Sequence, residues 1–134
     1  MNPLPDPLRT FIADAPVCRI ATVRDDGAPH LIPVCPVFDG ESTVYVDIGD
    51  RSASAEGART RGQVAVLIDH YEDDWTKLKA VLLHCRAEIV SGEEQDRAWN
   101  MIREKFPQYS SVDWNPRLTL ALRIQDWRQW GITD

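Results

Sequence analysis

The sequence lacks the features of a membrane-spanning or secreted protein. Its 134 residues contain no apolar run near the roughly 18 residues that a membrane-spanning helix needs. The first residues, MNPLPDPLR, have neither a basic leader nor an apolar core, so we expect no signal peptide. Three cysteines are present, Cys18, Cys35 and Cys85, without a C-x-x-C pair. An odd number of cysteines, each in or beside an apolar run, predicts buried free thiols in a reducing cytoplasm.

Basic side chains are also few. Lys and Arg number 15 against 21 Asp and Glu, which gives a net charge of −6. A general surface for nucleic acid or for an anionic membrane needs clustered Lys and Arg, so we expect neither partner. The 43% hydrophobic content suits one compact domain over residues 1–134 with a core of its own.

The most informative stretch that is present covers residues 19–37, RIATVRDDGAPHLIPVCPV. Two apolar runs flank Asp26-Gly27, a strong hairpin signal because Gly adopts the positive φ that the turn needs. Pro33 and Pro36 interrupt the second run. Proline donates no ladder hydrogen bond, so we expect this strand at an edge, at a bulge, or where the backbone turns toward a ligand. Such a hairpin suggests a sheet that closes around something.

Apolar runs and period-two alternation predict about six strands. They cover residues 18–23, 30–37, 43–48, 63–69, 78–90 (as one strand or two) and 118–124. Hairpin connections dominate, so the predicted sheet is mainly antiparallel. Closure into a barrel would remove its exposed edges.

Three helices are expected beside these strands. Asp6-Pro7 is typical of the N-cap and first residue of a short helix. Ser52 is a typical N-cap for a second short helix, over residues 53–61. Residues 91–94, SGEE, fit the S-x-x-E capping box of a longer helix that reaches about Phe106.

The segment around the second helix start is a candidate phosphate site. A helix N-terminus presents backbone N–H groups and a partial positive charge, which suit a phosphate. Ser52 and Ser54 add hydroxyl donors, and Arg51 adds a charge that can bond two phosphate oxygens. Arg59 and Arg61 extend the patch if the helix turns them inward. An ordinary capped helix with solvated arginines explains the same pattern.

The histidines offer weaker signals. Residues 69–75, DHYEDDW, place carboxylates beside a histidine, but no spacing fixes a coordination geometry, so we expect a solvated hairpin connection and no metal site. His84 beside Cys85 is no catalytic pair, because adjacent strand residues point to opposite faces. A haem ligand among His30, His70 and His84 stays open.

An aromatic group near the end of the chain comprises Tyr109, Trp114, Trp127 and Trp130. Trp and Tyr are enriched at protein interfaces, which favours packing at a dimer seam. Alternatively, Trp127 or Trp130 of a partner chain covers a cofactor.

Four passages together resemble a known family. They are ATVRDDGAPHLIPV (residues 21–34), GDRS (49–52), VAVLIDHYEDDW (64–75) and KFPQY (105–109). The chain resembles the pyridoxamine 5′-phosphate oxidase-like FMN-binding split-barrel proteins. Within them it is most similar to the small oxidoreductases that use the deazaflavin coenzyme, factor 420. The pairing of the last two passages is the more specific part of this likeness.

The resemblance implies a mainly β fold, a six-stranded antiparallel split barrel that forms a homodimer. It implies a flavin-type cofactor, FMN or deazaflavin, in a groove between the subunits. The ring would lie against the first hairpin and the phosphate would be held after the third strand. No side chain is assigned as catalytic, because the cofactor carries the chemistry. The cofactor contacts that the resemblance implies are Arg19, Ala21, Thr22, Pro33, Val34, Asp47, Arg51, Ser52, Ser54, Arg59 and Trp127.

The chain departs from the family pattern at the phosphate segment. The family usually has basic residues and an Asn where this chain has Ser54, Glu56 and Gly57. Each charged contact is worth on the order of 1.5–3 kcal/mol, so their loss weakens binding. Three interpretations therefore stay open. The chain is a flavin- or deazaflavin-dependent oxidoreductase that transfers hydride to or from a small organic substrate, a non-catalytic flavin- or haem-binding protein, or a degenerate member without a cofactor.

Overall fold

The computed structural model of the protein describes residues 2–111 and 116–132. Within them, a single antiparallel sheet contains seven strands in the order β2-β1-β5-β6-β7-β4-β3. The strands are β1 (Cys18–Val23), β2 (Pro29–Val34), β3 (Val37–Phe38), β4 (Thr43–Ile48), β5 (Gln63–His70), β6 (Lys79–Val90) and β7 (Leu118–Trp130).

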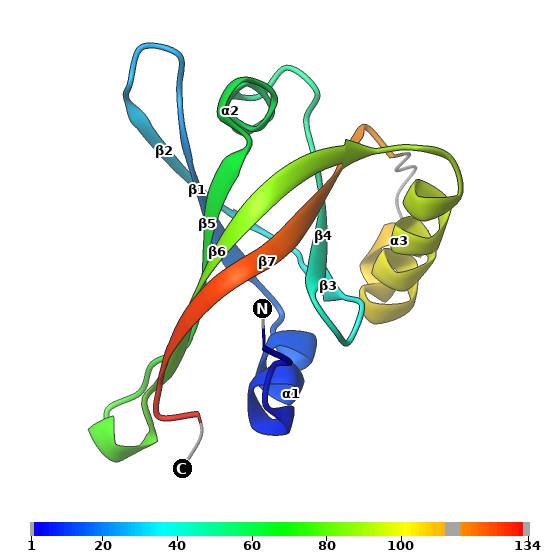
Figure 1. Cartoon of the computed structure of the whole chain (residues 1–134). Coiled ribbons are helices and arrows are strands. Elements are labelled where there is room, and N and C mark those ends of the chain that lie inside the picture. Colours follow the sequence, from blue (N-terminus) through cyan, green and yellow to red (C-terminus); the bar gives the residue numbers. More distant parts are fainter. Residues whose placement is uncertain (1, 112–115, 133–134) are drawn as a thin grey trace.

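Helices lie at the ends and on one flank of the curved sheet (Figure 1). They are α1 (Asp6–Asp14), α2 (Ala53–Arg61) and α3 (Gly92–Lys105), with short 3-10 helices η1 (Trp75–Lys77) and η2 (Pro107–Ser110). No helix in the described part of the chain combines the length and the apolar character needed to span a bilayer.

A two-residue link forces the sheet to curl. Only Cys35 and Pro36 separate β2 from β3, although these strands lie at opposite edges of the sheet. The three Cα–Cα steps across this link span at most about 11 Å. In a flat seven-stranded sheet the edges would lie about 29 Å apart, at ~4.8 Å per strand. The sheet therefore closes into the half-barrel of Figure 1.

The inner face of the curled sheet holds the main hydrophobic core. Ile20, Val66, Leu83 and Leu122 are all fully buried there. The apolar face of α1 closes one end of this interior through Leu8 and Ile12.

A second apolar cluster lies under α3. Trp99 and Ile102 of α3 pack against Tyr45 of β4 and Ala121 of β7. Tyr45 and Ala121 each lie between neighbours that face the interior, and successive strand residues point to opposite faces. This cluster therefore lies on the outer side of the sheet. The helix α2 contacts β1, β5 and β6 from the inner side of the sheet, where its Ala55 and Ala58 join the interior core, so it leaves the outer face of these strands uncovered.

The expected fold class is confirmed, but the strand count is seven among the described residues instead of six. The expected strand over residues 30–37 is two strands, because the chain changes edge at Cys35-Pro36. The expected end at Ile124 was also wrong. β7 continues to Trp130 because β6 is one long strand that pairs with it throughout, across an irregularity between His84 and Cys85.

Two of the three expected helix caps differ in the structure. Ser52 caps α2 as predicted, accepting a hydrogen bond from the Ala55 N–H at 3.1 Å. Asp6 lies in the first turn of α1 and Pro5 holds the N-cap position, so that expectation was wrong. The predicted capping box at Ser91 does not form either, since the Ser91 side chain makes no capping hydrogen bond.

Glu94 leaves the capping box because stronger donors lie nearby. Arg123 donates to both of its carboxylate oxygens, at 2.8 and 3.1 Å, and the Tyr45 hydroxyl donates to it at 2.7 Å. Charge-assisted hydrogen bonds outweigh a neutral backbone donor. These bonds tie α3 to β4 and β7, and they hold the pKa of Glu94 below its usual range.

This lowered pKa predicts an acid-dependent loss of stability. The contribution of Glu94 is complete above the unfolded pKa of about 4.3 and is lost as pH falls through the lower folded pKa. Glu94→Gln should lower the free energy of unfolding at pH 7 by up to about 1 kcal/mol, because the pair is partly exposed. Urea unfolding between pH 7 and pH 3 should show the two proteins converging at low pH. Parallel curves over the whole range would contradict this role.

Candidate functional site

The outward residues of the first hairpin and its neighbours form a row of small side chains. Along β1, Ile20 and Thr22 are buried while Ala21 faces outward and is partly exposed. Ala21 pairs with Ala65 on β5, and Ala65 pairs with His84 on β6. Paired residues in neighbouring strands lie on the same face. Two alanines and one histidine therefore lie side by side on the uncovered flank of the sheet.

A hollow of about 400 Å³ lies at this row, and we call it the outer groove. Its lining residues are Ala21, Thr22, Val23, Pro29, Gln63, Val64, Ala65, His84, Cys85 and Gln125.

The outer groove combines a flat, small-residue wall with a few polar groups. Ala21 and Ala65 leave the backbone open to close approach by a planar molecule. Gln63, His84 and Gln125 supply polar side chains at the margins. Organic ligands are usually held by a mainly apolar surface with a few placed polar groups. This chemistry fits a flat heteroaromatic ring system.

Three of these polar residues were missed by the sequence analysis. His84 was considered only as a partner for Cys85 or as one of several haem ligands. Its outward position follows from strand alternation, since Cys85 is 3% exposed and faces the core. Gln63 and Gln125 gave no signal. Gln125 is the extra residue opposite the His84–Cys85 step, and such a bulge re-aims the side chains beside it.

The predicted phosphate segment is only partly available for a ligand. The Ser52 hydroxyl is already used, donating to the Gly49 carbonyl at 2.7 Å and accepting from the Ala55 N–H. Ser54 is fully buried and its Oγ has no partner in the structure, so it faces inward. Arg51 is exposed and forms no ion pair with a described residue. The Arg59 guanidinium folds back to the Asp50 carbonyl at 2.9 Å, beside the start of α2.

Close packing of α2 on β1 explains one departure from the family pattern. A Cβ atom at Gly57 would lie 2.9 Å from the Cβ of Thr22 and 3.0 Å from the Val23 carbonyl oxygen. No side chain fits there without moving the helix. Thr22 Oγ1 is buried at this contact and has no partner in the structure. Glu56, in the first turn of α2, places a negative charge near the candidate phosphate position.

Comparisons with known proteins agree with this architecture. The family model of pyridoxamine 5′-phosphate oxidase matches residues 4–131. The chain belongs to the pyridoxamine 5′-phosphate oxidase family. No curated protein matches the chain.

Solved structures share the family's fold at low sequence identity. A haem-binding protein from Mycobacterium smegmatis has a TM-score of 0.80 and 21% identity over 94% of this chain, which spans only 53% of that protein. The haem storage protein HutZ from Vibrio cholerae has a TM-score of 0.75 and 16% identity, covering 92% of this chain and 90% of its own. A FAD-binding protein from Mesorhizobium loti has a TM-score of 0.72 and 18% identity, covering 96% and 95%.

Other residues that the resemblance implies as cofactor contacts do not lie together on one surface. Arg19 pairs with Asp69 at 3.1 Å, next to the exposed Pro33. Val34 packs against the interior core, so Pro33 and Val34 lie on opposite faces of β2. The structure therefore does not bring both residues to one ring surface.

Two more of these residues lie away from the outer groove. Asp47 accepts hydrogen bonds from the Arg117 N–H at 3.2 Å and from the Thr119 hydroxyl at 3.3 Å, at the start of β7. Trp127 packs against the interior core of its own chain. Trp114 lies outside the described residues.

Burial keeps two of the three cysteine thiols protonated. Burial raises the pKa of Cys18 and of Cys85 to about 12. Burial also raises the pKa of Tyr109 to about 12, and this ring packs edge-on to Trp99 at 5.4 Å. In the described part of the chain, no three His, Cys, Asp or Glu side chains gather as metal ligands would.

The raised thiol pKa values predict selective labelling. A pKa of about 12 in place of 9.0 lowers the thiolate fraction at pH 8 by about 1,000-fold. Iodoacetamide should therefore modify half-buried Cys35 in the native protein while Cys18 and Cys85 stay unmodified, as measured by peptide mass spectrometry. All three should react in urea, which serves as the control. Native labelling of Cys85 at the rate of Cys35 would mean that the outer groove holds a reactive thiol.

Proposed function

We propose that the protein is a homodimeric oxidoreductase that binds a flavin-type cofactor in the outer groove and transfers hydride to or from a small organic substrate. The observation that supports the proposal is the Ala21–Ala65–His84 row, a flat wall that begins on β1, in the hairpin where the resemblance places the ring. The cofactor, when bound, supplies the hydride chemistry. The chain's own residues bind it, orient it and keep water from its face.

The phosphate of the cofactor would be held at the start of α2. Arg51 supplies the free charge, Arg59 supplies a second one, and the first turn of α2 supplies N–H groups. Glu56 opposes them. We therefore expect weaker binding than in relatives with more basic residues in this segment.

The proposed dimer follows from the same uncovered flank. Leu31 is 66% exposed, and Val23 and Leu67 are 38% and 37% exposed. Leu31 pairs with Ala21, so this apolar surface borders the outer groove. A second copy of the single 1–134 domain would bury it and complete the site, with the exposed Trp130 of that copy as a candidate cover for the ring in place of Trp127, which packs on its own core. The buried protonated thiols favour a cytoplasmic location.

FMN and deazaflavin are both within this proposal. The family as a whole favours FMN, and the FAD-binding protein from Mesorhizobium loti supports a flavin. The likeness of residues 64–75 and 105–109 to deazaflavin enzymes favours factor 420. The substrate class is a small organic molecule in either case.

A second candidate function is haem binding without catalysis. Two proteins of this fold are named for haem binding and haem storage. Of the three histidines, His84 is the one that lines the outer groove. An imidazole at the edge of a flat apolar wall is a suitable axial ligand for haem iron.

The phosphate position is tested by comparing FMN with riboflavin. Arg51→Ala should weaken FMN binding about tenfold, since a charged contact is worth on the order of 1.5–3 kcal/mol, and should leave riboflavin unchanged. Fluorescence quenching on titration measures both. Arg103→Ala, on the distant α3, is the control and should change neither. Equal losses for FMN and riboflavin would contradict this placement of the phosphate.

The ring position is tested by filling the outer groove. Ala65→Phe should reduce binding of FMN, riboflavin and factor 420 alike by at least about tenfold, because the ring would occupy the wall. Ala65→Ser keeps the volume nearly constant and should bind as the original protein does. Thermal unfolding checks that both variants fold. Undiminished binding by folded Ala65→Phe would exclude the outer groove.

His84 separates the two candidate functions. If haem is the ligand, His84→Ala should shift the Soret band of the complex and weaken haem binding while His70→Ala leaves both unchanged. If a flavin is the ligand, FMN should bind to His84→Ala within about threefold of the original affinity. If FMN, factor 420 and haem all fail to bind at micromolar concentrations, the protein is better interpreted as a degenerate member without a cofactor.

A further inference from the structure

A second hollow lies at the other end of β1, between α1 and the ends of β5 and β6. It has a volume of about 400 Å³, within the range of small-molecule sites. Val17 lines it at the start of β1, four residues before Ala21 in the outer groove. Four strand residues span about 13 Å, and the Arg19–Asp69 ion pair lies between the two hollows. This α1 hollow is therefore a separate site.

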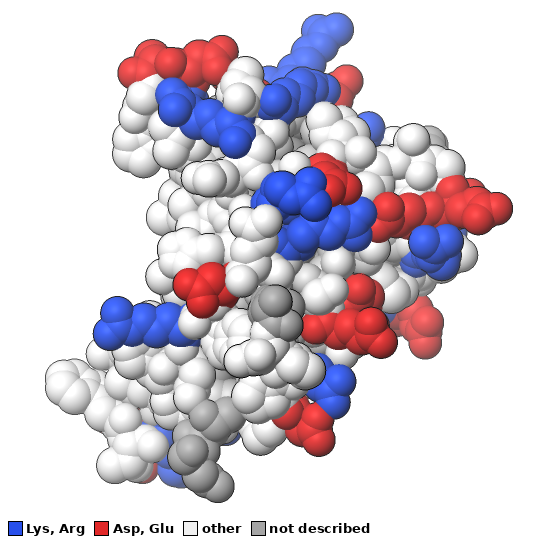
Figure 2. All heavy atoms as spheres, in the orientation of Figure 1, with Lys and Arg blue, Asp and Glu red and all other residues white. Residues whose placement is uncertain are grey.

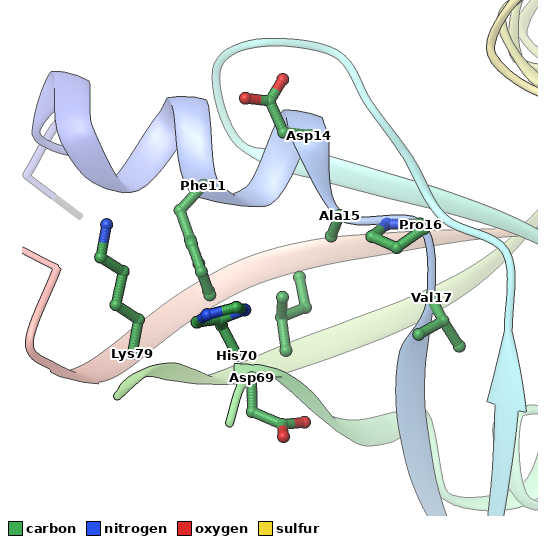
Figure 3. Close-up of a pocket in the computed structure, with 9 residues that line it drawn as sticks. Phe11, Asp14, Ala15, Pro16, Val17, Asp69, His70 and Lys79 are labelled. Atoms are coloured by element: carbon green, nitrogen blue, oxygen red, sulfur yellow. The ribbon is translucent and has the colours of Figure 1, made fainter. Parts of the chain in front are cut away.

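The walls of the α1 hollow are mostly apolar and include two rings. Figure 3 shows the Phe11 side chain descending from α1 toward the ring of His70 on β5. Ala15, Val17 and Ile68 complete the apolar lining. Rings in a lining favour a flat, unsaturated ligand through stacking and edge contacts.

The two carboxylates that line the α1 hollow point away from its rings. Asp69 accepts from Arg19 at 3.1 Å and its carboxylate points away from Phe11 in Figure 3. Asp14 also points away there.

His70 and Lys79 are the two basic groups of the α1 hollow. The His70 ring contacts Glu72. Lys79 is exposed, and its ammonium forms no hydrogen bond or ion pair with a described residue. It is thus a cation at this hollow that remains for a ligand, within the described part of the chain. An ammonium beside an apolar hollow selects an anionic group.

We infer that the α1 hollow binds small aromatic carboxylates, with the ring against Phe11 and His70 and the carboxylate on Lys79. This site needs no cofactor, so it stands independently of the oxidoreductase proposal.

The test uses benzoate as the probe, with neutral benzamide and cationic benzylamine beside it. Amide shifts of the full chain are followed by NMR during titration. Benzoate should shift Phe11, Val17 and His70 and leave Ala21 and Ala65 unmoved. Benzamide should bind about tenfold more weakly and benzylamine more weakly still, because one charged contact is lost or reversed.

Variants then test the role of the ammonium. Lys79→Met should bind benzoate only as well as benzamide, and Lys79→Arg should retain binding. Lys77→Met removes a cation two residues away and should match the original protein. The inference is overturned if Lys79→Met binds benzoate normally, if benzamide equals benzoate, or if the shifts fall in the outer groove. Absence of binding at about 10 mM benzoate also overturns it, whatever FMN does at the outer groove.

Discussion

The short link of Cys35 and Pro36 is the constraint on which the rest of the structure depends. It joins the two edges of one sheet, so the strands between them must curl into a half-barrel. Curling gives every strand an inner face, which the core fills, and an outer face, which must be covered in some other way. Proline suits this position because it has no backbone N–H, and the link between the two edge strands donates no hydrogen bond to a neighbouring strand.

A helix covers only part of the outer face of the sheet, and the candidate site lies on the part that is left uncovered. α3 covers β4 and β7 and is held there by the bonds of Glu94 to Arg123 and Tyr45. The flank of β1, β5 and β6 keeps small side chains such as Ala21 and Ala65 instead. Acidic and basic side chains alternate on the face in Figure 2 and form no extended field of one sign there. In the proposed function, recognition at the outer groove rests on shape and a few polar groups.

Local signals in the sequence were enough for the fold class and for much of the hairpin. The Asp26-Gly27 turn and the Ser52 cap depend on neighbours within a few residues, and both were predicted. Partners distant in sequence were beyond such reasoning. Glu94 left its expected capping box for Arg123, and Asp47 was taken up by Arg117 and Thr119 across the sheet. The bulge at Gln125 likewise depends on the pairing of two long strands.

The proposed function requires a flat cofactor to bind on the uncovered flank of the curled sheet. Amide chemical-shift mapping of the protein during FMN titration shows where the cofactor binds. We expect the largest shifts at Ala21, Ala65 and His84, with a second group at Arg51 near the start of α2. Shifts confined to α3 or to the α1 hollow, with the outer groove unmoved, would contradict it.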